Sequence, residues 1–241
     1  MHDLKASARQ VCERGYCVLP SVFTPAECQA IKKLLLAVWR ARGEPSLAGF
    51  GMGIHPLLEH APDMAPYYAR PIILDALEAV LQDEPRLAHT GARVSSEASD
   101  AAIGWHEHYA WDKQNVLDRK KPQRVLFGCY VNGSTPEAGP LVVLPRRLND
   151  PIAPAAPALK SDWPGQVVVH APPGSIVIFD TALYHTAHRG YESGLRILWG
   201  AHCQGRNNPM PHPEDNDADN ATLRRHVQHD SRLRRFLERT G

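Results

Sequence analysis

The sequence predicts a mainly β protein, a sandwich or barrel, with α-helices on either side of the strands in the chain. The first observation is a series of short apolar runs between turn residues after about residue 87, at 124–131, 140–144, 166–170, 174–179 and 195–203. The second is that apolar residues before residue 87 recur with helical spacing. Several strands at short, fairly even intervals are typical of sandwiches and barrels. We therefore expect a helical segment followed by a β core.

The 241 residues are enough for one sizeable core, because a chain of this mass buries roughly 70% of its unfolded surface. β domains of this length are often single units. We predict one domain over residues 1–241, with a mostly helical layer (1–86), a β core (87–204), and a polar loop with a C-terminal helix (205–241).

Composition excludes several classes of protein. The chain has 27 Lys and Arg against 26 Asp and Glu, a formal charge of +1, which is no basis for general nucleic-acid binding. No stretch approaches the roughly 18 apolar residues of a membrane span, and residues 1–5 do not begin a signal peptide. The cysteines are odd in number and form no CxxC pair, so we expect reduced thiols in a cytoplasmic protein. They are Cys12, Cys17, Cys28, Cys129 and Cys203.

The best-defined helix starts at Thr24. Thr24 can cap a helix, Pro25 suits the first helical position, and Glu27 completes a capping box. Apolar residues follow with the spacing of one buried helix face; they are Ile31, Leu34, Leu35 and Val38. The same reasoning predicts helices over 4–14, 71–82 and 221–239.

The most informative segment is 104–112, which reads Gly-Trp-His-Glu-His-Tyr-Ala-Trp-Asp. If it is a strand, His106 and His108 face the same side, because side chains alternate with a period of two. Two imidazoles on one face are suitable metal ligands. A lone H-x-H also occurs in polar surface loops, so this pair needs support from elsewhere in the chain.

Two later segments supply that support. Residues 174–185 form an apolar strand ending in a turn that delivers His185, and the next strand holds Arg196 among apolar residues. A buried charge needs a partner, and a guanidinium offers a bidentate fork to a carboxylate; alternatively, Arg196 faces solvent on an alternating strand. The order H-x-H, His, Arg resembles that of iron(II)/2-oxoglutarate oxygenases.

Further motifs extend this likeness, and the chain resembles the phytanoyl-CoA dioxygenase family over nearly its whole length. Residues 15–20 and the helix after Thr24 are similar to the family's opening strand and helix. Trp105 and His106 are similar to its W-H-x-D motif, and 138–145 to its N/A-G-P-L run. The resemblance implies a double-stranded β-helix, that is, a jelly roll with a helical N-terminal layer. It also implies iron(II), and 2-oxoglutarate as co-substrate.

One position departs from the family pattern, because His108 stands where the family has its metal-binding carboxylate. The metal is then held by three histidines, or a carboxylate arrives from elsewhere, with Asp112 the nearest. Glu107 is a weaker alternative, because adjacent strand residues face opposite sides. A fourth possibility is that the site binds no metal.

We therefore predict an iron(II)/2-oxoglutarate-dependent oxygenase that hydroxylates or otherwise oxidises a small molecule, such as one of natural-product metabolism. His106, His108 and His185 are the predicted metal ligands, and the resemblance makes Arg196 the residue that binds 2-oxoglutarate. Two alternatives remain: a cupin-like three-histidine oxygenase without 2-oxoglutarate, and a non-catalytic binding protein on the same fold. We expect no nucleic-acid or membrane partner. Substrate and oligomeric state do not follow from the sequence.

Overall fold

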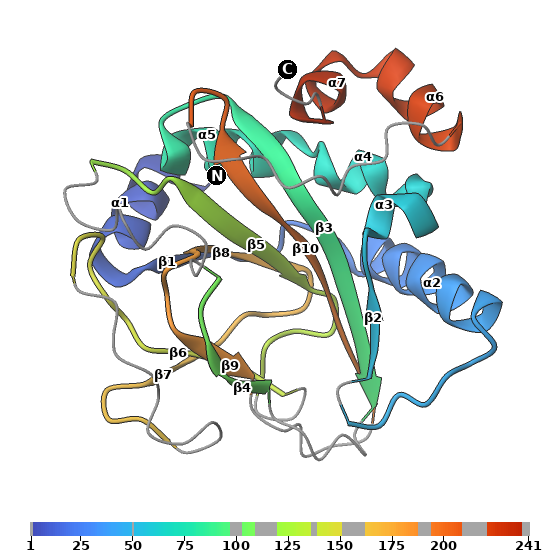
Figure 1. Cartoon of the computed structure of the whole chain (residues 1–241), viewed down its shortest axis with the longest axis horizontal. Coiled ribbons are helices and arrows are strands. Elements are labelled where there is room, and N and C mark those ends of the chain that lie inside the picture. Colours follow the sequence, from blue (N-terminus) through green and yellow to red (C-terminus); the bar gives the residue numbers. More distant parts are fainter. Residues whose placement is uncertain are drawn as a thin grey trace.

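The computed structural model describes residues 2–49, 51–96, 103–108, 120–135, 139–150, 162–187, 194–208 and 221–237. They form two antiparallel β-sheets, with most helices gathered beside the larger sheet (Figure 1). The prediction of a mainly β jelly roll with flanking helices is confirmed. The sheets of the described residues do not join into a closed barrel, so the barrel form of the prediction is replaced by two facing sheets.

The larger sheet has six strands in the order β1-β8-β5-β10-β3-β2. Strands β3 and β10 are its longest and pair along their whole length, with a register shift after His202. Strand β10 lies between β5 and β3, and β3 lies next to the edge strand β2; together β3 and β10 carry much of the site described below. The strands are β1 (Tyr16–Leu19), β2 (Met52–Ile54), β3 (Pro85–Ser96), β5 (Arg124–Tyr130), β8 (Ser175–Asp180) and β10 (Leu195–Gly205).

The smaller sheet has the order β4-β9-β6-β7. Its strands are β4 (Ile103–His106), β6 (Leu141–Val143), β7 (Val167–Val169) and β9 (His185–Ala187). Strands β4 and β9 pair so that His106 lies directly opposite His185. This pairing places two of the predicted metal ligands side by side.

Helix α2 begins where its capping residues predict. Thr24 and Glu27 form the expected capping box: the Thr24 N–H donates to Glu27 Oε2 (2.8 Å), and the Glu27 N–H donates to Thr24 Oγ1 (3.3 Å). None of the described helices combines the length and hydrophobicity needed to cross a bilayer. The helices are α1 (Leu4–Arg14), α2 (Pro25–Ala41), α3 (Leu57–His60), the 3₁₀ turn η1 (Pro62–Met64), α4 (Ala65–Tyr68), α5 (Pro71–Leu81), α6 (Ala221–His229) and α7 (Ser231–Leu237).

The prediction of a single helix over 221–239 is wrong, because the helix is interrupted at Asp230. The Asp230 carboxylate accepts hydrogen bonds from the N–H groups of Arg232 (2.9 Å) and Leu233 (3.0 Å). An aspartate that caps these N–H groups starts a new helix. The segment therefore forms two helices, α6 and α7, up to residue 237.

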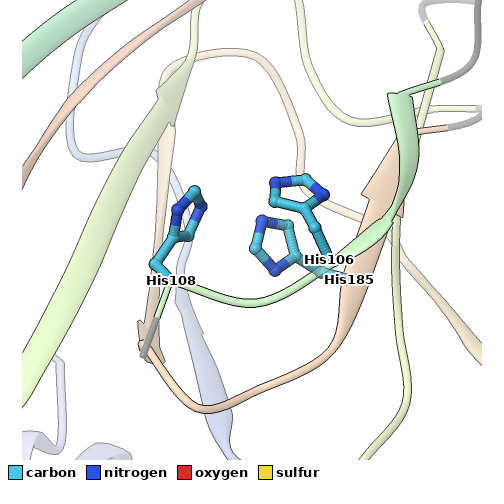
Figure 2. Close-up of side chains that lie close together, drawn as sticks. All are labelled: His106, His108 and His185. Carbon is cyan, nitrogen blue, oxygen red and sulfur yellow. The ribbon is translucent and has the colours of Figure 1, made fainter. Parts of the chain in front are cut away.

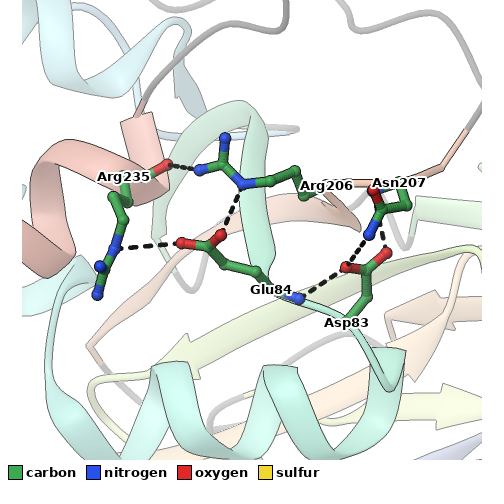
Figure 3. A network of polar contacts seen from close by, with 5 residues as sticks. All are labelled: Asp83, Glu84, Arg206, Asn207 and Arg235. Atoms are coloured by element: carbon green, nitrogen blue, oxygen red, sulfur yellow. Dashed lines mark hydrogen bonds and ion pairs between the residues drawn. The ribbon is translucent and has the colours of Figure 1, made fainter.

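A polar network holds α7 against the ends of β3 and β10 (Figure 3). The Glu84 carboxylate accepts a hydrogen bond from Arg206 Nε (2.6 Å) and pairs with Arg235 Nε (3.2 Å). Beside it, the Asp83 carboxylate accepts hydrogen bonds from the backbone N–H and Nδ2 of Asn207, both 3.0 Å long. The C-terminal helices are thus fixed to the β core.

Alternation along the central strands separates a core face from a cavity face. On β10, Ile197, Trp199 and Ala201 belong to the hydrophobic core shared with the helices. Trp199 is fully buried there, with its ring centroid 4.8 Å from that of Tyr68. The residues between them face the smaller sheet instead, and these residues line the site.

Candidate functional site

Three imidazoles converge between the two sheets, those of His106, His108 and His185 (Figure 2). One ligand nitrogen from each lies within 4.8 Å of the other two. The ring centroids of His106 and His185 are 4.2 Å apart, and each lies 4.9 Å from that of His108. The structure brings the three predicted ligands together.

Backbone hydrogen bonds orient these rings. His106 Nδ1 lies 2.8 Å from the carbonyl oxygen of Gly104, and His185 Nδ1 lies 3.0 Å from that of Leu183. An Nδ1–H donated to a carbonyl leaves Nε2 as the atom with a lone pair for a metal ion. Strand β4 ends at His106, so His108 lies just beyond the strand. Its backbone N–H donates to the carbonyl of Thr181 (2.8 Å), which fixes its position instead.

The three imidazoles are neutral at physiological pH. Burial is the largest cause: it lowers the pKa of His108 to about 2 and that of His185 well below its usual value. Burial also lowers the pKa of His106; its hydrogen bond to Gly104 opposes this effect, and the charge of Arg93 adds to it. Neutral imidazole is the form that binds metal ions.

Two arginines lie at one end of the site, which we call the cationic end: Arg93 and Arg196. Arg196 Nε donates a hydrogen bond to the carbonyl of Gly139 (2.8 Å), and its guanidinium lies 5.7 Å from the ring centroid of Tyr130. Arg93 lies on β3 opposite Leu198, two residues along β10 from Arg196. Burial, then the charge of Arg196, lowers the pKa of Arg93.

Three further histidines lie at the other end, which we call the imidazole end: His55, His89 and His202. His55 Nδ1 is 3.1 Å from His89 Nε2. The ring centroid of His202 lies 5.8 Å from that of His89 and 4.8 Å from that of His108. A row of imidazoles therefore leads from the exposed His55 to the three-histidine cluster. Burial, followed by the charges of neighbouring groups, lowers the pKa of His202 to about 3.

Between the two ends, three glycines lie in register across three strands. Gly200 of β10 pairs with Gly91 of β3 on one side and with Gly128 of β5 on the other. A Cβ atom at Gly91 would lie 2.4 Å from the His55 ring, and one at Gly200 would lie 1.9 Å from the Phe127 carbonyl oxygen. The result is a floor without side chains of its own, over which the His55 ring packs at Gly91; glycine in a strand is found where a ligand or another chain segment approaches closely.

All these groups line one cavity of about 490 Å³. Its described lining contains six histidines and two arginines, and no aspartate or glutamate. Apolar side chains complete the walls; they are Leu126, Tyr130, Leu141, Phe179 and Leu198. The size is that of a small-molecule site.

Sequence reasoning missed four residues of this cavity: His55, His89, Arg93 and His202. The alternation along β3 and β10 is the signal that could have found three of them, because His89, Gly91 and Arg93 share a face, as do Arg196, Gly200 and His202. His55 follows a short strand and carries no such signal.

Of the two residues weighed as alternative metal ligands, the structure describes only Glu107. Glu107 is half-buried, and the described metal-binding group does not include it. Its charge acts on Tyr184 instead and, after burial, raises the pKa of that phenol. Asp112 lies outside the described residues.

Comparison with known proteins identifies the family. Residues 11–196 match the model of the phytanoyl-CoA dioxygenase family (PhyH). The chain belongs to the phytanoyl-CoA dioxygenase family. No curated protein matches the sequence of this PhyH protein.

Solved structures share the fold of this PhyH protein. HygX from Streptomyces hygroscopicus, with nickel and 2-oxoglutarate bound, has a TM-score of 0.69 at 17% identity, covering 91% of this chain and 93% of its own. SnoK, the non-haem α-ketoglutarate-dependent carbocyclase of nogalamycin biosynthesis, has a TM-score of 0.66 at 16% identity, covering 88% and 94%. EctD from S. alaskensis, with 2-oxoglutarate and 5-hydroxyectoine, has a TM-score of 0.66 at 17% identity, covering 93% and 88%. At these identities the likeness concerns the fold.

Proposed function

We propose that this protein is an iron(II)/2-oxoglutarate-dependent oxygenase that oxidises a small molecule. The observation that carries the proposal is the convergence of His106, His108 and His185 beside Arg196 in one cavity. Membership of the PhyH family agrees with it. HygX has been solved with nickel and 2-oxoglutarate and also with iron, and EctD with 2-oxoglutarate, which supports the same assignment.

The donor set fits a divalent transition metal. Imidazole nitrogen suits iron(II), nickel and zinc, and each of the three neutral imidazoles has a ligand atom within 4.8 Å of those of the other two. In this proposal, the metal supplies the chelation of a 2-oxo acid and the activation of O₂. His106 and His185 bind it through Nε2, and His108 completes the set.

The remaining residues bind and shield the reactants. Arg196 binds the distal carboxylate of 2-oxoglutarate, because a guanidinium offers a bidentate, permanently charged partner. Tyr130 and Leu198 form apolar wall beside it, which lowers the local dielectric and strengthens that ion pair. Phe179 packs against the His185 ring with centroids 4.8 Å apart and limits its movement.

The cluster contains no carboxylate from the described part of the chain, which favours a second candidate, a three-histidine oxygenase that does not use 2-oxoglutarate. The third, from another class, is a binding protein that has lost the chemistry. The three candidates differ in whether the chain binds metal and whether it consumes 2-oxoglutarate.

The test combines metal analysis with product detection. Protein loaded anaerobically with iron(II) is assayed for bound iron, and then for succinate after addition of 2-oxoglutarate and O₂. We expect about one iron per chain and succinate formation. His185→Ala should abolish both and leave the circular dichroism spectrum unchanged. Iron without succinate supports the second candidate, and no iron supports the third. Equal iron in His185→Ala and wild type would remove His185 from the ligand set.

A further inference from the structure

Three aromatic residues gather behind the histidine cluster, outside the cavity: Trp105, Trp163 and Tyr184. Trp105 directly precedes His106 in the chain, and Tyr184 directly precedes His185. Neighbouring side chains of an extended segment face opposite sides, and accordingly the described lining of the cavity contains none of the three aromatic residues. The two strands that present imidazoles to the cavity thus carry aromatic rings next to them, directed elsewhere.

Trp163 contacts both of the other rings. Its ring centroid lies 5.8 Å from that of Trp105 and 5.9 Å from that of Tyr184, with interplanar angles of 81° and 64°. Both pairs have the edge-to-face arrangement that aromatic rings favour at such distances. Trp163 begins the turn that precedes β7, and the order of the smaller sheet is β4-β9-β6-β7. A residue beside the strand at one edge of this sheet therefore contacts the strand at the opposite edge.

Hydrogen bonds within the turn fix the position of Trp163. The Gln166 N–H donates to the Trp163 carbonyl (3.0 Å), and the Trp163 N–H donates to Gln166 Oε1 (2.9 Å). Gln166 Nε2 also donates to Asp162 Oδ1 (2.8 Å). Strand β7 begins at the next residue, Val167, which pairs with Val143 of β6. Trp163 is thus anchored to the sheet through β7 and β6, independently of β4.

Strand β4, in contrast, has little pairing of its own. It has four residues, lies at the edge of the smaller sheet, and pairs with β9 with a register shift between its two ends. His106 is its last residue, and His108 follows two positions later, so both depend on the placement of this strand. Trp105 is only 5% exposed, and its contact with Trp163 is one of those that cover it. Packing of Trp105 therefore supplements the short ladder that holds β4.

We propose that Trp163 is a positioning residue of the metal site. Through Trp105 and Tyr184 it holds β4 and β9 together from outside the cavity, so that their imidazoles are already arranged when a metal ion arrives. Ligands that are fixed beforehand lose less conformational entropy on binding. The inference rests on the proposed function, which makes the three histidines metal ligands. It makes metal affinity depend on a residue that does not line the cavity.

The experiment measures Co²⁺ affinity by calorimetry and the visible absorption spectrum of the bound Co²⁺, which reports its coordination. In Trp163→Ala, Co²⁺ should bind about tenfold more weakly, as for other residues that orient metal ligands, and the spectrum should change. Trp163→Phe keeps a ring that can pack against Trp105 and Tyr184, and it should restore most of the affinity and the wild-type spectrum.

Trp39→Ala is the matched control. Trp39 is also a half-buried tryptophan, but it lies on α2, where its Nε1 donates a hydrogen bond to the Pro45 carbonyl (2.8 Å). Its loss should lower the unfolding temperature and leave the Co²⁺ affinity and spectrum unchanged. Thermal unfolding shows whether each variant is folded; if Trp163→Ala is not, Trp163→Leu takes its place.

The outcomes separate this inference from the proposed function. Unchanged Co²⁺ affinity and spectrum in Trp163→Ala, with binding that depends on His185, would overturn the positioning role and leave the oxygenase proposal in place. Equal losses of affinity in Trp163→Ala and Trp39→Ala would also overturn it, because general destabilisation would then explain the effect. Failure of Trp163→Phe to restore affinity would mean that the ring contacts do not carry it. A wild type that binds no Co²⁺ would contradict the three-histidine site and this inference together.

Discussion

The two ends of the cavity are built from the same pair of strands but carry different kinds of charge. Strands β3 and β10 place Arg93 and Arg196 at the cationic end and His89 and His202 at the imidazole end. An arginine keeps its charge at any physiological pH, whereas burial keeps His202 uncharged, with a pKa of about 3. One alternating pattern therefore produces one end suited to anions and one end suited to uncharged hydrogen-bonding groups.

The largest effect that distinguishes the two ends is expected from the substitution of Arg196. Arg196→Leu should weaken 2-oxoglutarate binding by roughly 2–5 kcal/mol, the range for truncated buried charge pairs, and should change Co²⁺ affinity far less. His202→Leu is the matched variant at the imidazole end and should leave 2-oxoglutarate affinity near that of wild type. Calorimetry on both variants decides the point: similar losses in both would mean that the two ends do not divide the ligands between them.

Of the two ends of the cavity, the imidazole end is the one that acidity should affect. The pKa of His202 is about 3 in the folded protein and about 6.5 in the unfolded chain, so the unfolded state binds more protons between these values. The contribution of His202 to folding stability is therefore fully present above about pH 6.5. It decreases as the pH falls toward 3, by up to about 1.4 kcal/mol per pH unit.

His202→Gln should make that pH dependence shallower, because the variant takes up about one proton fewer on unfolding. The measurement is the free energy of unfolding by urea at a series of pH values from 7 to 4, for wild type and variant. An identical pH dependence in the two proteins would mean that His202 does not stay neutral in the folded state.

Replacing His108 with a carboxylate tests the site between the two ends. His108→Asp adds a negative charge beside the metal, which should tighten iron(II) binding by roughly tenfold and speed the conversion of 2-oxoglutarate to succinate. The wild-type site, with fewer anionic donors, should bind iron weakly and react slowly. If His108→Asp binds iron more weakly and loses all turnover, the carboxylate of the wild-type site comes from elsewhere, and Asp112→Asn should then abolish iron binding.

The smallest expected effect concerns the glycine floor between the ends. In Gly128→Ala the new methyl group would lie 3.0 Å from Leu198 Cδ1, a flexible side chain that can yield. We expect a change in unfolding free energy below about 1 kcal/mol and unchanged affinity for Co²⁺. A loss of several kcal/mol in the free energy of unfolding would show that these glycines are required for folding rather than for keeping the cavity open.

Local sequence signals predicted the local features of this molecule well. The Thr24–Glu27 capping box is present, as is the helix predicted over 71–82. His106, His108 and His185 lie together, although their role as ligands stays a prediction. These features depend on neighbours in the chain or on a family pattern.

What the sequence did not reveal depends on strand register. Arg93 and Arg196 are 103 positions apart in the printed sequence, and only the pairing of β3 with β10 makes them neighbours. A shift of one residue would have turned Arg93 toward the helices. The break at Asp230 was missed for another reason: one capping side chain outweighed a continuous helical pattern.

The glycine floor also limits how this cavity can change by mutation. Glycine is the smallest residue, so no single substitution at Gly91, Gly128 or Gly200 can enlarge the space above the floor. Contacts with His55 and with the Phe127 carbonyl already restrict the first and the last. A larger substrate can therefore be accommodated only through smaller side chains in the walls of the cavity. A substitution at Gly128, in contrast, can narrow the cavity and so restrict the substrates that fit.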